Sequence, residues 1–340
     1  MIDEATVWAR LDALAKPQRS LGVLEALAVR LAVIQQRLDP VTRPRAITLF
    51  AADHGVVAQG VSAWPSAVTG LMMATILGGK ASSAALAAAQ DCALRLVDVG
   101  AIAPPPQPWP GHYRACPVAL GTADLALGPA MTNAQFDAAW AIGADEAARA
   151  IAAGNAILIA GEMGIGNTTP AACLTMLLAG AAAATAVGRG AGADDGAMAI
   201  KTRIVTAAAA RALALLAENP RAAIAAVAGF EIIAMAGFFA AGAAAGAVLL
   251  LDGYVATAAA LVAEHLAPGT ALRMIAAHRS AEPGHGAALD RLGLTPLLDW
   301  QMRLGEGSGA LVALPLLDSA AAIIRDVALL SDLLPPATAE

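Results

Sequence analysis

Charged side chains are scarce in this sequence: Asp, Glu, Lys and Arg make up only 14% of its 340 residues. Acidic residues outnumber basic ones, which gives a formal net charge of −6. Because a nucleic-acid-binding surface normally carries a basic patch, this charge balance argues against a nucleic-acid partner. Hydrophobic residues make up 58%, and the length is sufficient for one large domain or for a main domain with an appendage.

Cysteines are also few. Cys92, Cys116 and Cys173 lie far apart, are odd in number and form neither a CxxC pair nor a disulfide framework. This pattern favours a reducing compartment. The first residues, Met1-Ile2-Asp3-Glu4, lack the basic-then-apolar order of a signal peptide. We therefore expect a cytoplasmic protein.

The uncharged stretch 232–251 is a candidate membrane span, and its Gly242 and Gly246 match the small-xxx-small spacing of packed membrane helices. Alanine and glycine nevertheless contribute little insertion free energy, and the flanking residues are Glu231 and Asp252 rather than Lys or Arg. The stretch also divides into a helix and an apolar run typical of a buried parallel strand. We therefore expect no membrane span.

Short apolar runs alternate with longer Ala-rich stretches along the chain, and several runs end at a polar or glycine-bearing turn. This pattern predicts an α/β fold with a parallel sheet flanked by helices, in which ligands bind beyond the carboxyl ends of the strands. Leucine spacing predicts an amphipathic helix over 20–38, closed by Pro40. The strand candidates are 46–51, 94–99, 156–160, 223–227, 247–251 and 272–276.

Two glycine-rich turns could bind an anion. The first, 161–170, nearly matches a phosphate-binding loop, but Asn167 occupies the lysine position, which argues against a nucleoside triphosphatase. Its glycines and the following helix start can still offer N–H groups to a single phosphate. The second turn, 188–195, precedes Lys201, and the two loops together fit a sugar phosphate. A tight strand-to-helix turn and a capped loop are the respective alternatives.

Glu306 lies in the glycine-rich string Arg303-Leu304-Gly305-Glu306-Gly307-Ser308-Gly309-Ala310. Backbone without Cβ atoms allows a ligand to approach closely, so this acid is a candidate base or polar anchor. The alternative is a solvated acid at a helix start. The residues that could form a metal cluster match no compact ligand spacing, so we predict no metal. These residues are Asp53, His54, Asp252, His278, Glu282 and His285.

These segments together resemble the nicotinate-nucleotide–dimethylbenzimidazole phosphoribosyltransferase family of cobalamin biosynthesis, and the resemblance runs nearly end to end. It is carried by long strings in the family's order. They are Lys16 to Glu25, Ala52-Asp53-His54-Gly55-Val56, Gly60-Val61-Ser62, Gly161 to Thr169, Gly229-Phe230-Glu231, Leu251-Asp252-Gly253, His278 to Glu282, and Arg303 to Ala310.

The resemblance implies transfer of ribose 5-phosphate from nicotinate mononucleotide to 5,6-dimethylbenzimidazole, with inversion at the anomeric carbon and with no cofactor or metal. By similarity, Glu306 is the catalytic base. The family's phosphoribosyl-binding positions fall on Glu162, Gly164, Lys201 and Ser280, with Gly190 and Gly192 as further phosphate candidates. Its benzimidazole pocket falls on Trp64, Met72, Leu304 and Glu306.

Some family members have a small polar residue and a glutamine where this chain has Trp64 and Met72, which leaves the choice of base open. The family fold implies a large α/β domain at about 40–300, a small helical domain at about 1–39 plus 301–340, and a homodimer. A relative that ribosylates another aromatic base or a phenol, or a non-catalytic phosphoribosyl-binding protein, is the alternative function.

Overall fold

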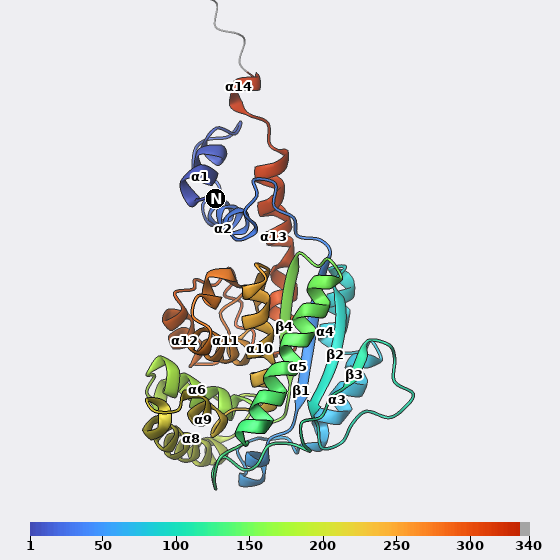
Figure 1. Ribbon diagram of the computed structural model, residues 1–340, viewed down its shortest axis with the longest axis vertical. Helices are drawn as coiled ribbons and strands as arrows, with labels where there is room; N and C mark the ends of the chain where they lie inside the picture. The colour runs from blue at the N-terminus through green and yellow to red at the C-terminus, as the bar shows by residue number, and fades with distance from the viewer. Residues whose placement is uncertain (334–340) are drawn as a thin grey trace, which may run out of the picture.

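The computed structural model describes residues 1–333. At its centre is a six-stranded sheet in which every neighbouring pair is parallel and the strand order is β3-β2-β1-β4-β5-β6. The predicted parallel α/β fold is therefore confirmed (Figure 1). The strands are β1 (Arg45–Ala52), β2 (Ala93–Gly100), β3 (Tyr113–Ala115), β4 (Ile157–Met163), β5 (Val248–Leu251) and β6 (Met274–Ala276).

Helices surround the sheet and connect its strands. The α-helices are α1 (Glu4–Asp12), α2 (Val23–Gln35), α3 (Ala67–Leu77), α4 (Ser82–Ala89), α5 (Asn133–Ala152), α6 (Thr168–Ala179), α7 (Ala183–Ala186), α8 (Asp195–Leu216), α9 (Pro220–Ala225), α10 (Phe230–Ala244), α11 (Tyr254–Leu266), α12 (His285–Leu292), α13 (Ser308–Asp326) and α14 (Leu330–Leu333). Two short 3₁₀ helices are η1 (Gly55–Gln59) and η2 (Thr270–Arg273).

Side chains alternate between the two faces of the sheet and so supply two separate hydrophobic cores. On β1, Ile47 and Leu49 belong to the core shared with α2, α3 and α13, whereas Phe50 belongs to the core shared with α5, α10 and α11. Figure 1 shows α5 crossing in front of the strands and α3 behind them. Burial of both faces explains why the strands appear in the sequence as continuous apolar runs.

The N-terminal helices α1 and α2 lie beside α13 above one end of the sheet (Figure 1). Helix α13 packs against α2, which also contacts α1, and Leu14 pairs with Leu329 in an antiparallel bridge. The division into domains at 40–300 and at 1–39 plus 301–340 stays a prediction, and residues 334–340 of the smaller domain lie outside the described residues.

Two stretches match a membrane span in length and composition. Ala67–Ala89 consists of two helices, α3 and α4, separated by a turn at Gly78-Gly79, and Ser308–Asp326 is a helix more than half buried in the protein. The uncharged stretch 232–251 is helix α10 followed by β5, as predicted. Among the residues that the structure describes, there is therefore no clear span.

Four sequence predictions differ from the structure. The strand expected at 272–276 is shorter, because residues 272–273 belong to η2 and β6 begins at Met274. The strand expected at 223–227 is wrong, because residues 223–225 form the end of helix α9 and a turn follows them. Asn219 caps this helix through its side chain, and Pro220 begins it. The predicted helix over 20–38 is shorter, because it begins after Gly22 and ends at Gln35, before Gln36, whose backbone is left-handed. Strand β4 continues to Met163, so the first glycine-rich turn begins later than expected.

Candidate active site

A cavity of about 460 Å³ opens at the carboxyl edge of the sheet. Glu162 lies near the end of β4, Asp252 follows β5 and Ser280 follows β6, and all three line the cavity. Glu306 lines it from the turn before α13. The strand order reverses between β1 and β4, and open parallel sheets bind ligands at such a reversal. The cavity therefore lies where the strand-end turns predicted a site.

Most residues predicted to bind substrate line this single cavity. They are Trp64, Met72, Glu162, Gly164, Gly190, Ser280, Leu304 and Glu306. Two predicted residues do not line it. Gly192 is exposed in the same turn as Gly190, and Lys201 is buried behind the wall. The fold thus brings together side chains that are up to 242 positions apart, from Trp64 to Glu306.

Glu306 lies within three consecutive residues that have left-handed backbone conformation. The φ angle is +88° at Gly305, +57° at Glu306 and +70° at Gly307. Glycine adopts this conformation freely, but a glutamate there is strained, and such strain persists mainly at functional sites. A Cβ atom at Gly305 would overlap the Glu162 carboxylate, so glycine lets the two acids approach. Glu306 is only 4% exposed, which rules out the solvated-acid alternative.

Asp252 holds this turn in place. Its Oδ1 accepts hydrogen bonds from the N–H groups of Gly309 at 2.7 Å and Ala310 at 3.3 Å, and its Oδ2 accepts from Gly307 at 3.1 Å. These groups belong to the start of α13, where N–H groups lack partners within the helix. Burial opposes ionisation, but His278 and the backbone donors outweigh it and keep the pKa of Asp252 below its usual range.

The Glu306 carboxylate is held from another part of the fold. Ser83 Oγ, in the first turn of α4, donates a hydrogen bond to Glu306 Oε2 at 2.8 Å, and both side chains are buried. Sequence reasoning missed Ser83. No local pattern could have found it, because 223 positions separate it from its partner.

Glu162 is the second acid of the cavity. Asn167 Nδ2 donates a hydrogen bond to Glu162 Oε2, so the residue in the lysine position of a phosphate loop serves here to orient this acid. Burial raises the pKa of Glu162 to about 8, and the carboxylates of Asp252, Glu231 and Glu306 add to the effect. At neutral pH, Glu162 therefore carries a proton that it can donate to a substrate oxygen.

Hydrogen bonds join the two glycine-rich turns. Lys201 Nζ donates to Thr168 Oγ1 at 2.7 Å and to the Gly188 carbonyl oxygen at 2.8 Å. In the second turn, Gly190 N–H donates to Glu282 Oε1 at 2.9 Å. Burial lowers the pKa of Lys201 to about 8, so its side chain is mostly protonated at neutral pH. A cation beside the first turn of α6 suits an anionic group in the adjoining cavity.

Trp64, Met72 and Leu304 form an apolar part of the cavity wall. Trp64 Nε1 donates to the Ala191 carbonyl oxygen at 3.2 Å, so the ring connects the segment after η1 to the second glycine-rich turn. Trp64 and Leu304 are about half exposed, which places them at the rim. A wall of this kind accepts a flat aromatic ring.

The residues considered for a metal cluster are divided among separate interactions. His54 Nε2 lies 2.9 Å from Glu231 Oε1, and His278 Nε2 lies 3.7 Å from Asp252 Oδ1. Burial lowers the pKa of His285 to about 3, which keeps this ring neutral. Within residues 1–333, no group of three or more His, Cys, Asp or Glu side chains gathers in a way that could hold a metal ion.

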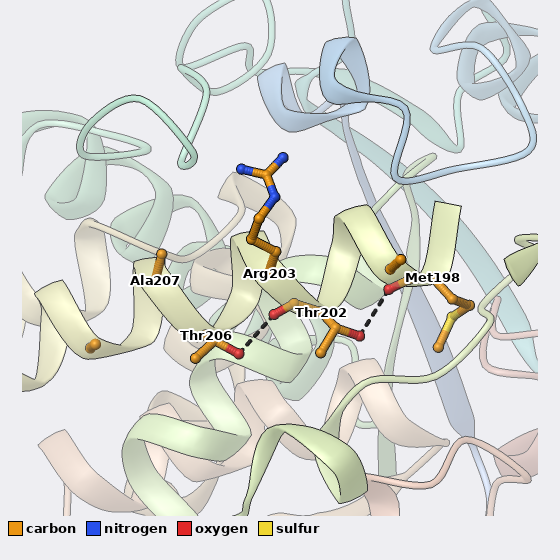
Figure 2. Close-up of a pocket in the computed structure, with 7 residues that line it drawn as sticks. Met198, Thr202, Arg203, Thr206 and Ala207 are labelled. Atoms are coloured by element: carbon orange, nitrogen blue, oxygen red, sulfur yellow. Dashed lines mark hydrogen bonds between the residues drawn. The ribbon is translucent and has the colours of Figure 1, made fainter. Parts of the chain in front are cut away.

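A second hollow, of about 670 Å³, lies on the outer face of α8 (Figure 2). The hydroxyls of Thr202 and Thr206 both donate to carbonyl oxygens of the same helix, at 2.8 Å and 2.7 Å. Arg203 is the one charged residue among those that line this hollow. With its hydroxyls already paired, this hollow offers few groups for chemistry, and we place the active site at the sheet edge.

Comparison with known proteins shows which family the whole chain resembles. A family model described as Phosphoribosyltransferase matches residues 3–332. The nicotinate-nucleotide–dimethylbenzimidazole phosphoribosyltransferase of Thermus thermophilus is 46% identical over 318 residues, which cover 93% of each chain. Its counterpart in Mycolicibacterium paratuberculosis is 44% identical over 325 residues, 95% of this chain and 92% of the other. The crystal structure of CobT from Thermus thermophilus superposes with a TM-score of 0.92 at 44% identity, covering 97% of this chain and 98% of that one.

Proposed function

Because this chain belongs to the nicotinate-nucleotide–dimethylbenzimidazole phosphoribosyltransferase family, we propose that its cavity binds nicotinate mononucleotide and a benzimidazole-type base, and that Glu306 is the catalytic base. The observation that carries the proposal is the Glu306 carboxylate itself. It is buried at the cavity in a strained turn that Asp252 and Ser83 hold. A carboxylate held in this way is suited to remove a proton from a bound substrate.

The reaction requires one proton transfer and one substitution. The Glu306 carboxylate takes the N–H proton of the benzimidazole while the other ring nitrogen attacks the anomeric carbon of the ribose. The bond from that carbon to the nicotinate nitrogen breaks, and its electron pair neutralises the pyridinium ring. Because the departing ring was cationic, it leaves without an acid catalyst. Attack from the opposite face converts a β-glycosidic bond into an α bond.

The remaining polar groups suit the ribose and its phosphate. Glu162 lies beside the Glu306 turn and carries a proton at neutral pH, so we assign it to a ribose hydroxyl. We assign the phosphate to the turns that contain Gly164 and Gly190, with Lys201 supplying a positive charge from behind them. Ser280 contributes from the end of β6. Holding both substrates in line would provide much of the rate enhancement.

The apolar rim suits the aromatic base. Trp64 and Met72 are bulkier and more apolar than a small polar residue and a glutamine, so we propose that this pocket selects a base with apolar substituents, such as 5,6-dimethylbenzimidazole. We further propose that the enzyme is a homodimer, as the family resemblance implies. We also propose that it works in the cytoplasm, a reducing compartment in which its three free cysteines stay unpaired.

The test is a reaction of the purified protein with nicotinate mononucleotide and a panel of acceptors that includes 5,6-dimethylbenzimidazole, adenine and phenol. We expect equal amounts of nicotinate and α-ribazole 5′-phosphate, with the α configuration established by NMR. Faster release of nicotinate with adenine or phenol than with 5,6-dimethylbenzimidazole would favour the alternative, a related enzyme that ribosylates another acceptor. Binding of nicotinate mononucleotide without nicotinate release from any acceptor would favour a non-catalytic binding protein.

A further inference from the structure

The hydroxyl group of Ser83 donates a buried hydrogen bond to the carboxylate of Glu306. We propose that Ser83 is a positioning residue, which fixes the Glu306 carboxylate so that one oxygen is presented to the substrate proton. This inference rests on the proposed role of Glu306 as the base. It adds a residue from α4, a helix that contributes no residue to the cavity lining.

The geometry assigns different tasks to the two carboxylate oxygens. Oε2 accepts the hydrogen bond from Ser83 Oγ at 2.8 Å. Within residues 1–333, Oε1 takes no hydrogen bond. It is also not one of the fully buried polar atoms that lack a partner, so it is accessible. Since Glu306 lines the cavity, Oε1 is the oxygen available to a bound base.

Ser83 also completes the restraint of the Glu306 side chain. The left-handed turn and Asp252 fix the backbone of Glu306, but a glutamate side chain retains rotamer freedom of its own. A hydrogen bond to the terminal carboxylate removes much of that freedom before the substrate binds. Ser83 itself is fully buried in a helix, so it is a rigid donor. Reactive groups held this way lose less entropy in the reaction.

The surroundings of Glu306 make a neutral donor valuable. The titratable groups that face its turn are Glu162 from β4, Asp252 after β5 and His278 after β6. Two of these three are acids, and a hydroxyl donor can restrain the Glu306 carboxylate among them without adding a charge. The Ser83 hydroxyl, in the first turn of α4, supplies such a donor to Oε2. Ser83 therefore acts on the position of the base.

The experiment compares Ser83→Ala with Ser82→Ala, a matched control, since Ser82 is the exposed neighbour in the same helix turn. For Ser83→Ala we expect kcat to fall about tenfold, with the KM for nicotinate mononucleotide unchanged. Ser83→Thr, which keeps the hydroxyl, restores part of the rate, and Ser82→Ala behaves as the wild type.

Further variants distinguish a loss of folding from a loss of the positioning role. If Ser83→Ala is unfolded at the assay temperature, Ser83→Cys, which has a similar size and a weak donor, carries the same expectation. A Ser83 variant that is folded and matches Ser82→Ala in kcat overturns the positioning role, provided that Glu306→Gln is inactive. An active Glu306→Gln overturns the proposed base instead. In the Glu306→Gln background, Ser83→Ala should cause no further loss, and an additional tenfold loss there would show that Ser83 acts elsewhere.

Discussion

The ammonium nitrogen of Lys201 lies 2.7 Å from Thr168 Oγ1 and so joins the two glycine-rich turns. Its second hydrogen bond, to the Gly188 carbonyl oxygen at 2.8 Å, engages another of its three N–H groups. The side chain is buried, and burial lowers its pKa to about 8. A charge in this position both shapes the proposed phosphate site and makes it sensitive to pH.

We predict that Lys201→Met weakens binding of nicotinate mononucleotide by about tenfold to a hundredfold, as expected for the loss of a buried positive charge behind the phosphate site together with its two hydrogen bonds. Titration calorimetry measures this directly. Arg203→Met is the control, because Arg203 is an exposed cation on the same helix. In the wild type, kcat/KM for nicotinate mononucleotide should fall as the pH rises through about 8, where Lys201 loses its proton. An unchanged affinity in Lys201→Met would show that Lys201 plays no part in binding nicotinate mononucleotide.

Trp64 should determine the choice of base. Its ring lines the cavity, and its indole N–H bonds to Ala191 in the second glycine-rich turn. We predict that Trp64→Ser lowers the preference for 5,6-dimethylbenzimidazole over adenine by about tenfold, because apolar contact with the methyl groups is lost. A competition assay with both bases measures the product ratio. Trp300→Ser, at an exposed tryptophan that does not line the cavity, should leave the ratio unchanged. An unaltered product ratio in Trp64→Ser would show that residues other than Trp64 determine the choice of base.

The buried pair of His54 and Glu231 should stabilise the fold in a pH-dependent manner. Burial alone would lower the pKa of His54, but the Glu231 carboxylate at 2.9 Å outweighs it and raises this pKa above its usual value. The folded protein therefore binds the His54 proton more tightly than the unfolded chain. The resulting stabilisation is complete below about pH 6.5 and is lost as the pH rises through the raised pKa of the folded state.

We predict that Glu231→Gln lowers the free energy of unfolding by about 3 kcal/mol at pH values near 6, since it leaves a buried cation without a partner. The loss should become smaller at higher pH, where His54 is neutral. Urea unfolding at several pH values tests this, with Glu218→Gln as a control at an exposed glutamate. A loss that is equal at all pH values would mean that the pair acts through packing rather than charge.

Patterns of apolar residues were enough to predict most of the sheet, because strands buried on both faces form continuous apolar runs. Strand β3 escaped prediction because its three residues, Tyr113–Ala115, carry no such run. The false strand at 223–227 had a contrary signal in Asn219-Pro220, a cap followed by a residue favoured at the first helix position. At this position the helix-starting signal of Asn219 and Pro220 determined the secondary structure, and the apolar run did not.

The active site was only partly predictable. Glycine-rich strings indicated Glu162 and Glu306, because unusual residues in turns are visible locally. The contact between Ser83 and Glu306 depends on how α4 and α13 pack, and this packing leaves no periodic trace in the sequence. The raised pKa of Glu162 likewise depends on burial and on acids that are distant in the chain. Such properties emerge only from the folded arrangement.

The most direct test of the central claim is the turnover of Glu306→Gln at saturating concentrations of both substrates. The substitution keeps the size of the side chain and its hydrogen bond with Ser83, but removes the base. We predict that kcat falls by about 10²-fold to 10⁴-fold, while the Kd for nicotinate mononucleotide stays within about threefold of the wild-type value. A kcat close to that of the wild type would contradict the assignment of Glu306 as the catalytic base.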